Sequence, residues 1–488
     1  MSVIRAPLLS LLALLAAAAA ADEWPTVRHD IARTGYTADF VRPPVKLAWQ
    51  RSFENGPIAT CVEPIVAEGK VFVSSLNGTL YAVQAADGSD LWQFSARGPL
   101  LHSPAYEKGK VYVGSVDGGL YCLDAASGAV RWRFDGGRGG FAASPTVENG
   151  VVYIGSRGGI FHAIRDEGDR ASQVWSFDAG APIWQTAALA RRKVYFTAEN
   201  LVAHALKKEL GIRWWHSRPM SGYKARDYYP CVLGEHVVFR TSPADGEERV
   251  IKEGGAALLR VSNFAGKNEV VIARKLDAVR PWDAPGVMVE SEATGLESFL
   301  TKDRPEHRTF YIFTAEDGVE VPAPLLWTGG CGGVASPPAA ARDGSVYVAW
   351  RSLFTGWIER GTAAVYGTAP RHGIARIPLG TGMPRRFDPA VPGKVPWGVF
   401  LMSNEANTLQ VGGNYLYIVH QSTLCALDLA TRRISVLLGT RDLWGGQPAL
   451  GWAANEWRGP ARGGIAIAGR RAYWIVGSHL LALEGTAE

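Results

Sequence analysis

The chain has 488 residues, too many for one ordinary hydrophobic core, so it contains either several domains or a repeat array. Hydrophobic residues make up 47% of it and charged residues 20%, a balance that excludes a disordered chain. The formal net charge of +5 is small and scattered along the sequence, so no nucleic-acid partner is expected.

Residues 1–21 have the organisation of a secretory signal peptide. Arg5 supplies a positive charge, an apolar run of about 13 residues follows, and Ala19 to Ala21 form a small-residue cleavage site before Asp22. A membrane anchor is the alternative, but a spanning helix needs roughly 20 apolar residues. No cysteine follows the apolar run, so a lipid anchor is not expected either. The prediction is an exported protein, periplasmic or extracellular, with no transmembrane span.

Three consecutive segments within residues 64–177 repeat one pattern. Each has a short apolar strand after a proline, a Gly-x-Val-Tyr-Val-like strand, a Gly-x-Leu-Tyr-like strand, and a fourth strand with a tryptophan. The tryptophans Trp92, Trp132 and Trp175 recur at about 40 residues, which is typical of the four-stranded blades of a β-propeller. The tryptophans expected to pack between adjacent blades are Trp49, Trp92, Trp132, Trp175, Trp214 and Trp327.

The two ends of the chain complement each other. Residues 46–53 resemble the last strand of a blade that has no earlier strands, and residues 464–483 contain three strands without a fourth. Pairing these ends closes the ring and removes two exposed sheet edges. With blades at 61–94, 102–134, 143–177, 184–215, 228–327, 334–388 and 407–438, the prediction is an all-β, eight-bladed propeller of four-stranded antiparallel blades.

Residues 22–488 are therefore expected to form a single propeller domain with an insertion at about 241–308. The insertion is charged and interrupts the fifth blade. It is either a decorative loop or a lid or arm for a partner, and the sequence favours neither.

The repeat resembles the pyrroloquinoline-quinone (PQQ) repeat, most closely over residues 115–132, and residues 24–35 resemble the leading segment of PQQ-like propellers. The resemblance implies membership of the quinoprotein-dehydrogenase-like superfamily. One group in it holds PQQ and Ca²⁺ and oxidises alcohols or sugars; another comprises exported binding scaffolds. The adjacent cysteines and the CxxCH motif typical of the dehydrogenases are absent here, so the chain resembles the non-catalytic members.

The motif search assigns no catalytic, cofactor-binding or metal-binding residue. The sequence has no HExxH, GxSxG, Walker-type or EF-hand motif. Its cysteines are Cys61, Cys122, Cys231, Cys331 and Cys425, an odd number that leaves at least one unpaired, and none forms a CxxC pair. His162 and His204 stand where Tyr81 and Tyr121 stand in earlier repeats, so they are expected to pack between strands.

Ligand contacts are expected on one face of the ring, where the loops leading into the innermost strands meet those joining the second and third strands of each blade. We call this the funnel face. A single polar residue in such a loop is more often a cap or a solvated side chain than a ligand contact. The candidates together supply polar and aromatic groups: His102, Arg138, Arg157, Trp184, Gln185, Glu405, His420, Asn455, Glu456 and Arg458.

The sequence favours a monomeric scaffold, without cofactor and without enzymatic activity, that binds an unknown protein, small molecule or glycan through this face. The first alternative is a dehydrogenase of alcohols or sugars that uses PQQ and calcium. The second is a glycan-binding propeller, suggested by tryptophans outside the repeated position, at 350, 357, 397, 444, 452 and 457.

Overall fold

A computed structural model describes residues 23–53, 56–59, 61–220, 225, 229–241, 248–253, 256–262, 269–275, 310–321, 339–340, 345–351, 372–378, 398–401, 406–420, 423–431, 434–439 and 464–486. The elements in these residues are all strands. Within the same residues, no helix has the length and apolar character that a membrane crossing requires. The predicted signal peptide, residues 1–21, lies outside the described residues.

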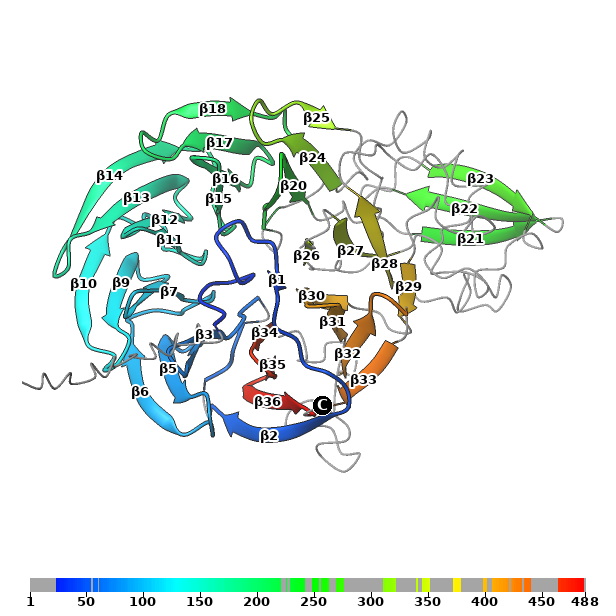
Figure 1. Cartoon of the computed structure of the whole chain (residues 1–488). Helices are drawn as coiled ribbons and strands as arrows, with labels where there is room; N and C mark the ends of the chain where they lie inside the picture. The colour runs from blue at the N-terminus through cyan, green and yellow to red at the C-terminus, as the bar shows by residue number, and fades with distance from the viewer. Residues whose placement is uncertain are drawn as a thin grey trace, which may run out of the picture.

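Four-stranded sheets are arranged as a ring around a common centre (Figure 1). In most of these sheets the innermost strand is the shortest, and the next strands follow outward as antiparallel neighbours. The first four are β3 (Ile65–Ala67), β4 (Lys70–Ser74), β5 (Thr79–Gln84) and β6 (Asp90–Ser95); β7 (Ala105–Glu107), β8 (Lys110–Gly114), β9 (Gly119–Asp124) and β10 (Val130–Asp135); β11 (Thr146–Glu148), β12 (Val151–Gly155), β13 (Ile160–Asp166) and β14 (Ala171–Asp178); β15 (Ala188–Ala190), β16 (Lys193–Thr197), β17 (Ala203–Lys207) and β18 (Arg213–His216).

The rest of the ring follows the same plan with longer connections. Its sheets are β19 (Cys231–Leu233), β20 (His236–Arg240), β24 (Phe310–Thr314) and β25 (Glu320–Val321); β26 (Ala339–Ala340), β27 (Ser345–Arg351), β28 (His372–Pro378) and β29 (Gly398–Leu401); β30 (Ala406–Gly412), β31 (Tyr415–His420), β32 (Thr423–Asp428) and β33 (Ile434–Gly439), joined by β1 (Tyr36–Thr37); and β34 (Ile465–Ala468), β35 (Arg471–Val476), β36 (His479–Gly485) and β2 (Val45–Ser52).

The prediction of eight four-stranded blades is wrong. Among the described residues, seven sheets are four-stranded blades. The sheet of β30 to β33 has five strands, because β1 pairs in parallel with β30, with Tyr36 opposite Val411 and Thr37 opposite Gly412. Strand β1 has two residues and lies before the first repeat, so no periodic pattern in the sequence could predict it.

The predicted closure of the ring is confirmed. Strand β2 from the start of the chain pairs antiparallel with β36 from its end, with Leu47 opposite Leu483 and Ser52 opposite His479. Both strands lie side by side at the lower edge of Figure 1. The pairing covers the outer edge of β36 and completes a four-stranded blade from the two ends of the chain.

The fifth blade is interrupted. Its strands β20 and β24 are direct neighbours, with Val238 opposite Ile312, although residues 241–309 lie between them in the chain. Within that stretch β21 (Glu248–Glu253), β22 (Ala256–Ser262) and β23 (Glu269–Lys275) form a separate antiparallel sheet outside the ring (Figure 1).

Tryptophans join neighbouring blades at the outer rim. Trp92 Nε1 donates to the carbonyl oxygen of Ala125 at 3.1 Å, and Trp175 Nε1 donates to that of Lys208 at 2.8 Å, each in the next blade. A methyl group added at Gly211 would lie 2.4 Å from the Trp175 ring, so the ring rests directly on the glycine. The predicted packing of these rings between blades is confirmed.

One position in that series is corrected. Trp215 lies opposite Ala205, as Trp175 lies opposite Ala163, and is 8% exposed, whereas Trp214 is 44% exposed. Neighbouring residues in a strand face opposite sides, so only the register decides which tryptophan points into the interface. Trp327 lies outside the described residues.

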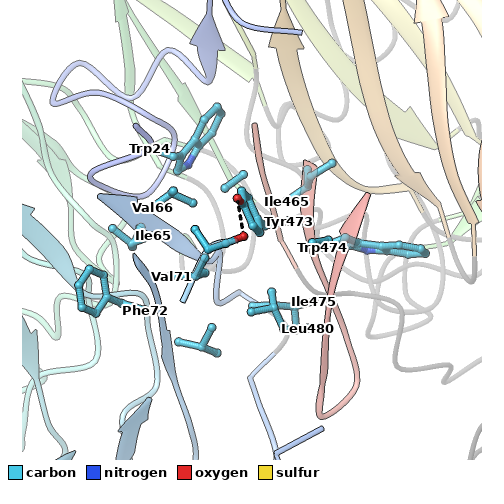
Figure 2. Close-up of a cluster of buried hydrophobic side chains, with 14 of the residues drawn as sticks. Trp24, Ile65, Val66, Val71, Phe72, Ile465, Tyr473, Trp474, Ile475 and Leu480 are labelled. Carbon is cyan, nitrogen blue, oxygen red and sulfur yellow. Dashed lines mark hydrogen bonds between the residues drawn. The ribbon is translucent and has the colours of Figure 1, made fainter. Parts of the chain in front are cut away.

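The closing sheet and the first blade share one buried cluster. Figure 2 shows Tyr473 of β35 on the side of Val71 of the first blade and Trp474 on the other side of that strand, with Trp24 from the start of the chain above Val66. Burial on both faces explains why the inner strands are almost uniformly apolar, whereas the outer strands alternate.

Candidate functional site

Residues 23–42 cross the centre of the ring, and we call them the channel segment (Figure 1). The segment exchanges backbone hydrogen bonds with the innermost strands of six sheets in turn. The bonds are Trp24 N to Val66 O, Tyr106 N to Pro25 O, Leu189 N to Ile31 O, Val232 N to Ala32 O, Ala340 N to Thr34 O and Val411 N to Gly35 O, at 2.6–2.9 Å. The central channel is therefore occupied by the chain itself.

Arg28 anchors this segment through a buried ion pair. Its backbone N–H donates to Glu63 Oε2 at 2.7 Å, its Nη1 lies 3.9 Å from Glu63 Oε1, and Nη1 also donates to the carbonyl oxygen of Leu409 at 2.5 Å. Gln410 Nε2 donates to Glu63 Oε1 at 3.0 Å. Burial raises the pKa of Glu63, and the positive charge of Arg28 acts against that shift.

Arg33 is the second buried arginine of the channel segment. Its guanidinium donates to the carbonyl oxygens of Ala187 at 3.0 Å and Val27 at 2.7 Å and to Thr26 Oγ1 at 2.6 Å. Burial lowers its pKa to about 10, so it stays charged at neutral pH. Arg33 thus joins the segment to the loop that leads into β15.

Gly35 allows the segment to turn back beside Arg28. Its φ is +64°, in the left-handed region that glycine adopts without strain. A methyl group there would lie 2.4 Å from Arg28 Nη2. The stretch that resembles the leading segment of PQQ-like propellers is therefore a channel plug, a role that its sequence alone did not reveal.

The funnel face is formed by the two kinds of loop that the sequence predicted: the turns between second and third strands and the loops leading into each blade. In three consecutive blades of the described chain, the turn between the second and third strands bonds to the loop leading into that blade: Val116 N to Pro99 O at 3.0 Å, Arg157 N to Gly140 O at 2.9 Å and Glu199 N to Pro182 O at 2.9 Å. Both kinds of loop therefore lie at one face of the ring.

Hydroxyl groups connect neighbouring loops at the floor of this face. Ser103 Oγ accepts from Glu63 N at 2.8 Å, and Thr186 Oγ1 accepts from Ser144 N at 3.0 Å. The repeated Ser-Pro pairs before β7 and β11 are the sequence signal that could have identified this floor.

His102 is the centre of the floor. Its Nδ1 accepts from Ser144 Oγ at 2.6 Å and from Ser103 N at 3.0 Å, so Nε2 carries the proton and donates to Tyr229 Oη at 2.7 Å. Burial, and secondarily the charge of Arg33, lowers the pKa of His102 to about 3. The imidazole is therefore neutral and ties together loops of three blades.

This arrangement resembles a serine–histidine pair but lacks its chemistry. Ser144 is 1% exposed and His102 is 5% exposed, so a substrate carbonyl has no access to the hydroxyl. The partner of His102 Nε2 is a phenol, which does not stabilise an imidazolium as a carboxylate does. We therefore assign a structural role to His102, Ser144 and Tyr229.

The predicted contact residues divide into two groups. His102 and Gln185 are buried in the floor, and Gln185 Nε2 donates to the carbonyl oxygen of Ala225 at 2.5 Å. Arg138 is exposed, and the Arg157 guanidinium lies 4.9 Å from the centroid of the half-buried Trp184 ring. Glu405, Asn455, Glu456, Arg458 and the side chain of His420 lie outside the described residues.

His162 and His204 are buried between blades, at 4% and 2% exposure. His162 contacts Phe134, and His204 stacks on Phe196 at a centroid distance of 5.0 Å. Burial lowers the pKa of both, that of His204 to about 4. They pack as the tyrosines of earlier repeats do.

The floor residues do not fit PQQ and calcium. Calcium takes several oxygen ligands, usually including carboxylates. The Glu63 carboxylate at the floor is engaged by Arg28 and Gln410. Over the described part of the chain, no three His, Cys, Asp or Glu side chains are grouped as metal ligands would be, and Cys122, Cys231 and Cys425 are free thiols.

Comparisons with known proteins agree with this architecture. A family model described as outer membrane protein assembly factor BamB matches residues 45–165, 76–222 and 117–264. No curated protein matches the chain.

Solved structures show the same fold at low sequence identity. BamB from Moraxella catarrhalis is 11% identical with a TM-score of 0.53, and the match covers 90% of this chain and 99% of that one. Quinohemoprotein alcohol dehydrogenase from Comamonas testosteroni is 16% identical with a TM-score of 0.53, covering 97% and 82%. A europium-containing methanol dehydrogenase is 13% identical with a TM-score of 0.53, covering 95% and 98%.

These likenesses show the fold, and the family match places the repeat in the same group as the sequence pattern does. Residues 45–264 are thus similar to the PQQ-repeat family of the assembly factor BamB, and the chain has the β-propeller fold of that protein and of the quinoprotein dehydrogenases.

Proposed function

We propose that this propeller is an exported binding scaffold that receives a protein or ligand on its funnel face and catalyses no reaction. The observation that carries the proposal is the sealed centre of the ring. The channel segment fills the channel, and His102, Ser144 and Tyr229 bond to one another across the floor. Among the described residues, the exposed loops above the floor are the surface that this arrangement leaves for recognition.

The start of the channel segment leaves the funnel face free. Glu23 lies at the opposite face, where its carboxylate accepts from the backbone N–H of Glu68 at 3.4 Å in the turn between β3 and β4. The described chain therefore begins at the face opposite the proposed binding surface. This arrangement suits a protein whose signal peptide is removed and whose funnel then meets a partner.

The dehydrogenase alternative has less support from the described residues. Its chemistry requires a slot for PQQ and oxygen ligands for calcium, whereas the floor side chains are bonded to one another and to the plug. The glycan alternative rested on extra tryptophans, and their side chains lie outside the described residues. No observation therefore favours either alternative over a scaffold.

The first test is photo-crosslinking in the cell envelope of the producing organism. A photoreactive residue replaces exposed Pro99 on the funnel face or, as a matched control, Lys108 in the turn between β7 and β8 on the opposite face. We expect a discrete crosslinked species from position 99 and none from position 108. Equal crosslinking at the two positions would overturn the proposal.

The second test is titration of the mature protein with PQQ and Ca²⁺. We expect no saturable quinone absorbance and no rise in Tm. A saturable shift in both, followed by oxidation of an alcohol or sugar, would replace the scaffold proposal with the dehydrogenase.

A further inference from the structure

We propose that Arg138 and Arg157 form a carboxylate-binding subsite on the funnel face, with Trp184 holding one of the two guanidinium groups in place. The inference rests on the proposed scaffold function and specifies the chemistry of the group that the scaffold binds. It follows from four features of the blade formed by β11 to β14.

The two arginines project from backbone segments that touch. A methyl group added at Gly158, next to Arg157, would lie 2.4 Å from the carbonyl oxygen of Arg138 and 2.8 Å from its Cβ. A methyl group added at Gly139, next to Arg138, would lie 3.3 Å from the Cβ of Arg157. Two positive side chains therefore start from adjacent points on one surface.

Neither arginine is neutralised by a carboxylate of the described chain. The ion pairs formed by the described residues engage Arg51, Arg131, Arg133, Arg170 and other cations, but not Arg138 or Arg157. Two adjacent like charges repel each other, so the pair lowers the stability of the unbound surface slightly. A bound oxyanion reverses that repulsion and gains charge-assisted hydrogen bonds.

The neighbouring blade has the same loops, but there one arginine is balanced by one aspartate. There Arg97 corresponds to Arg138, Val116 to Arg157 and Asp117 to Gly158, because Gly98 contacts Asp117 as Gly139 contacts Gly158. Asp117 Oδ2 accepts from the backbone N–H of Arg97 at 3.1 Å. At the two aligned positions, the blade of β11 to β14 thus has Gly158 in place of the aspartate and Arg157 in place of the valine.

Trp184 limits the freedom of one guanidinium. The Arg157 Cζ lies 4.9 Å from the ring centroid, within the range of a cation–π contact. A guanidinium stacked by its face keeps its N–H groups, which lie in its plane, free to meet a carboxylate in a two-pronged contact. The stack thus reduces the entropy that binding would otherwise cost.

The ligand group is a carboxylate because two planar guanidinium groups match its two oxygens. Its source is either a small polycarboxylate or acidic side chains of a polypeptide. The two sources share the same subsite chemistry and are separated by using one probe of each kind.

The test measures binding of citrate and of hexaglutamate peptide to the mature protein at low ionic strength by isothermal titration calorimetry. Arg157→Val installs the residue type of the neighbouring blade, and Arg138→Ala removes the second charge. We expect each variant to lose at least tenfold in affinity for the probe that binds. Arg97→Ala, at the equivalent position, is the matched control and should change the affinity less than twofold.

The Tm of each variant, expected within 2 °C of the wild-type value, shows that the fold is kept. Binding of citrate alone or of the peptide alone supports the subsite and identifies the source of the carboxylate. The inference is overturned if neither probe binds, or if Arg97→Ala weakens binding as much as Arg157→Val does. In both cases crosslinking from position 99 would still show a scaffold, so failure of the subsite is distinguishable from failure of the proposed function.

Discussion

The outer rim and the central channel hold the same blades together by different means. At the rim, one contact is repeated: a tryptophan of one blade lies on a glycine of the next and donates to a neighbouring carbonyl, as Trp92 does to Ala125 and Trp175 to Lys208. In the channel, each contact occurs once. Arg28 meets Glu63 and Leu409, whereas Arg33 meets Ala187 and Val27.

The difference separates two ways of stabilising a ring. Rim contacts recur from blade to blade, so the loss of one leaves the others intact. Channel contacts involve buried charges, which are costly when a partner is removed. We therefore expect the channel to be the more sensitive region, and the following predictions test that expectation in order of decreasing effect.

Removal of the Arg28 charge should have the largest effect. Arg28→Met leaves the buried Glu63 carboxylate without its cation, and we expect a loss of about 3–5 kcal/mol in the free energy of unfolding. The double variant with Glu63→Gln should recover part of that loss, because no buried charge remains. Urea denaturation measures both. A single variant as stable as the double variant would contradict a dominant role for the buried charge.

Truncation at the rim should come next. Trp175→Ala removes a ring that is 9% exposed and rests on Gly211, so we expect a loss of about 3–4 kcal/mol. Trp214→Ala is the matched control at an exposed ring, with an expected loss below about 1 kcal/mol. Thermal unfolding of the two variants checks the corrected assignment, and a larger effect at Trp214 would restore the original one.

Acid should destabilise the interface of β17 with its neighbour. Burial lowers the pKa of His204 from 6.5 to about 4, so the unfolded chain binds a proton more readily than the fold does between these values. Stability is therefore full above pH 6.5 and falls, on the order of 3 kcal/mol for this group, as the pH decreases to about 4.

The variant His204→Phe keeps the stack on Phe196 and cannot be protonated. Its stability, measured by urea denaturation between pH 7 and pH 4, should fall less steeply than that of the wild type. Parallel curves for the two proteins would show that another group causes the acid sensitivity.

Glycine substitutions should have the smallest effect on stability. Two of them distinguish backbone strain at a positive φ from contact between the new methyl group and a tryptophan ring. Gly211 and Gly69 have φ values of +68° and +71°, so alanine is strained at both, at a cost of about 1 kcal/mol. Only at Gly211 would the new methyl group also strike the Trp175 ring; nothing lies within 4 Å of it at Gly69. Gly211→Ala should therefore lower the Tm more than Gly69→Ala, and equal shifts would exclude a close ring contact.

The candidate site was only partly predictable from the sequence. The loops of the funnel face could be identified because they recur in each repeat, and Arg138, Arg157 and Trp184 lie in those loops. The sequence did not reveal that His102 bonds to Ser144 and Tyr229, because these partners lie 42 and 127 residues away along the chain. Only ring closure brings loops of separate blades together.

The sequence by itself determined what repeats: the four-stranded unit, the rim tryptophans, and the pairing of β2 with β36 that closes the ring. Contacts that are equivalent in every blade require the same residue types at the same spacing, so they are visible as a repeat in the sequence. Tertiary structure alone decided the features that occur once. These are the choice of Trp215 over Trp214, the addition of β1 to the sheet of β30, and the course of the channel segment, all of which depend on register and on packing between residues far apart in the chain.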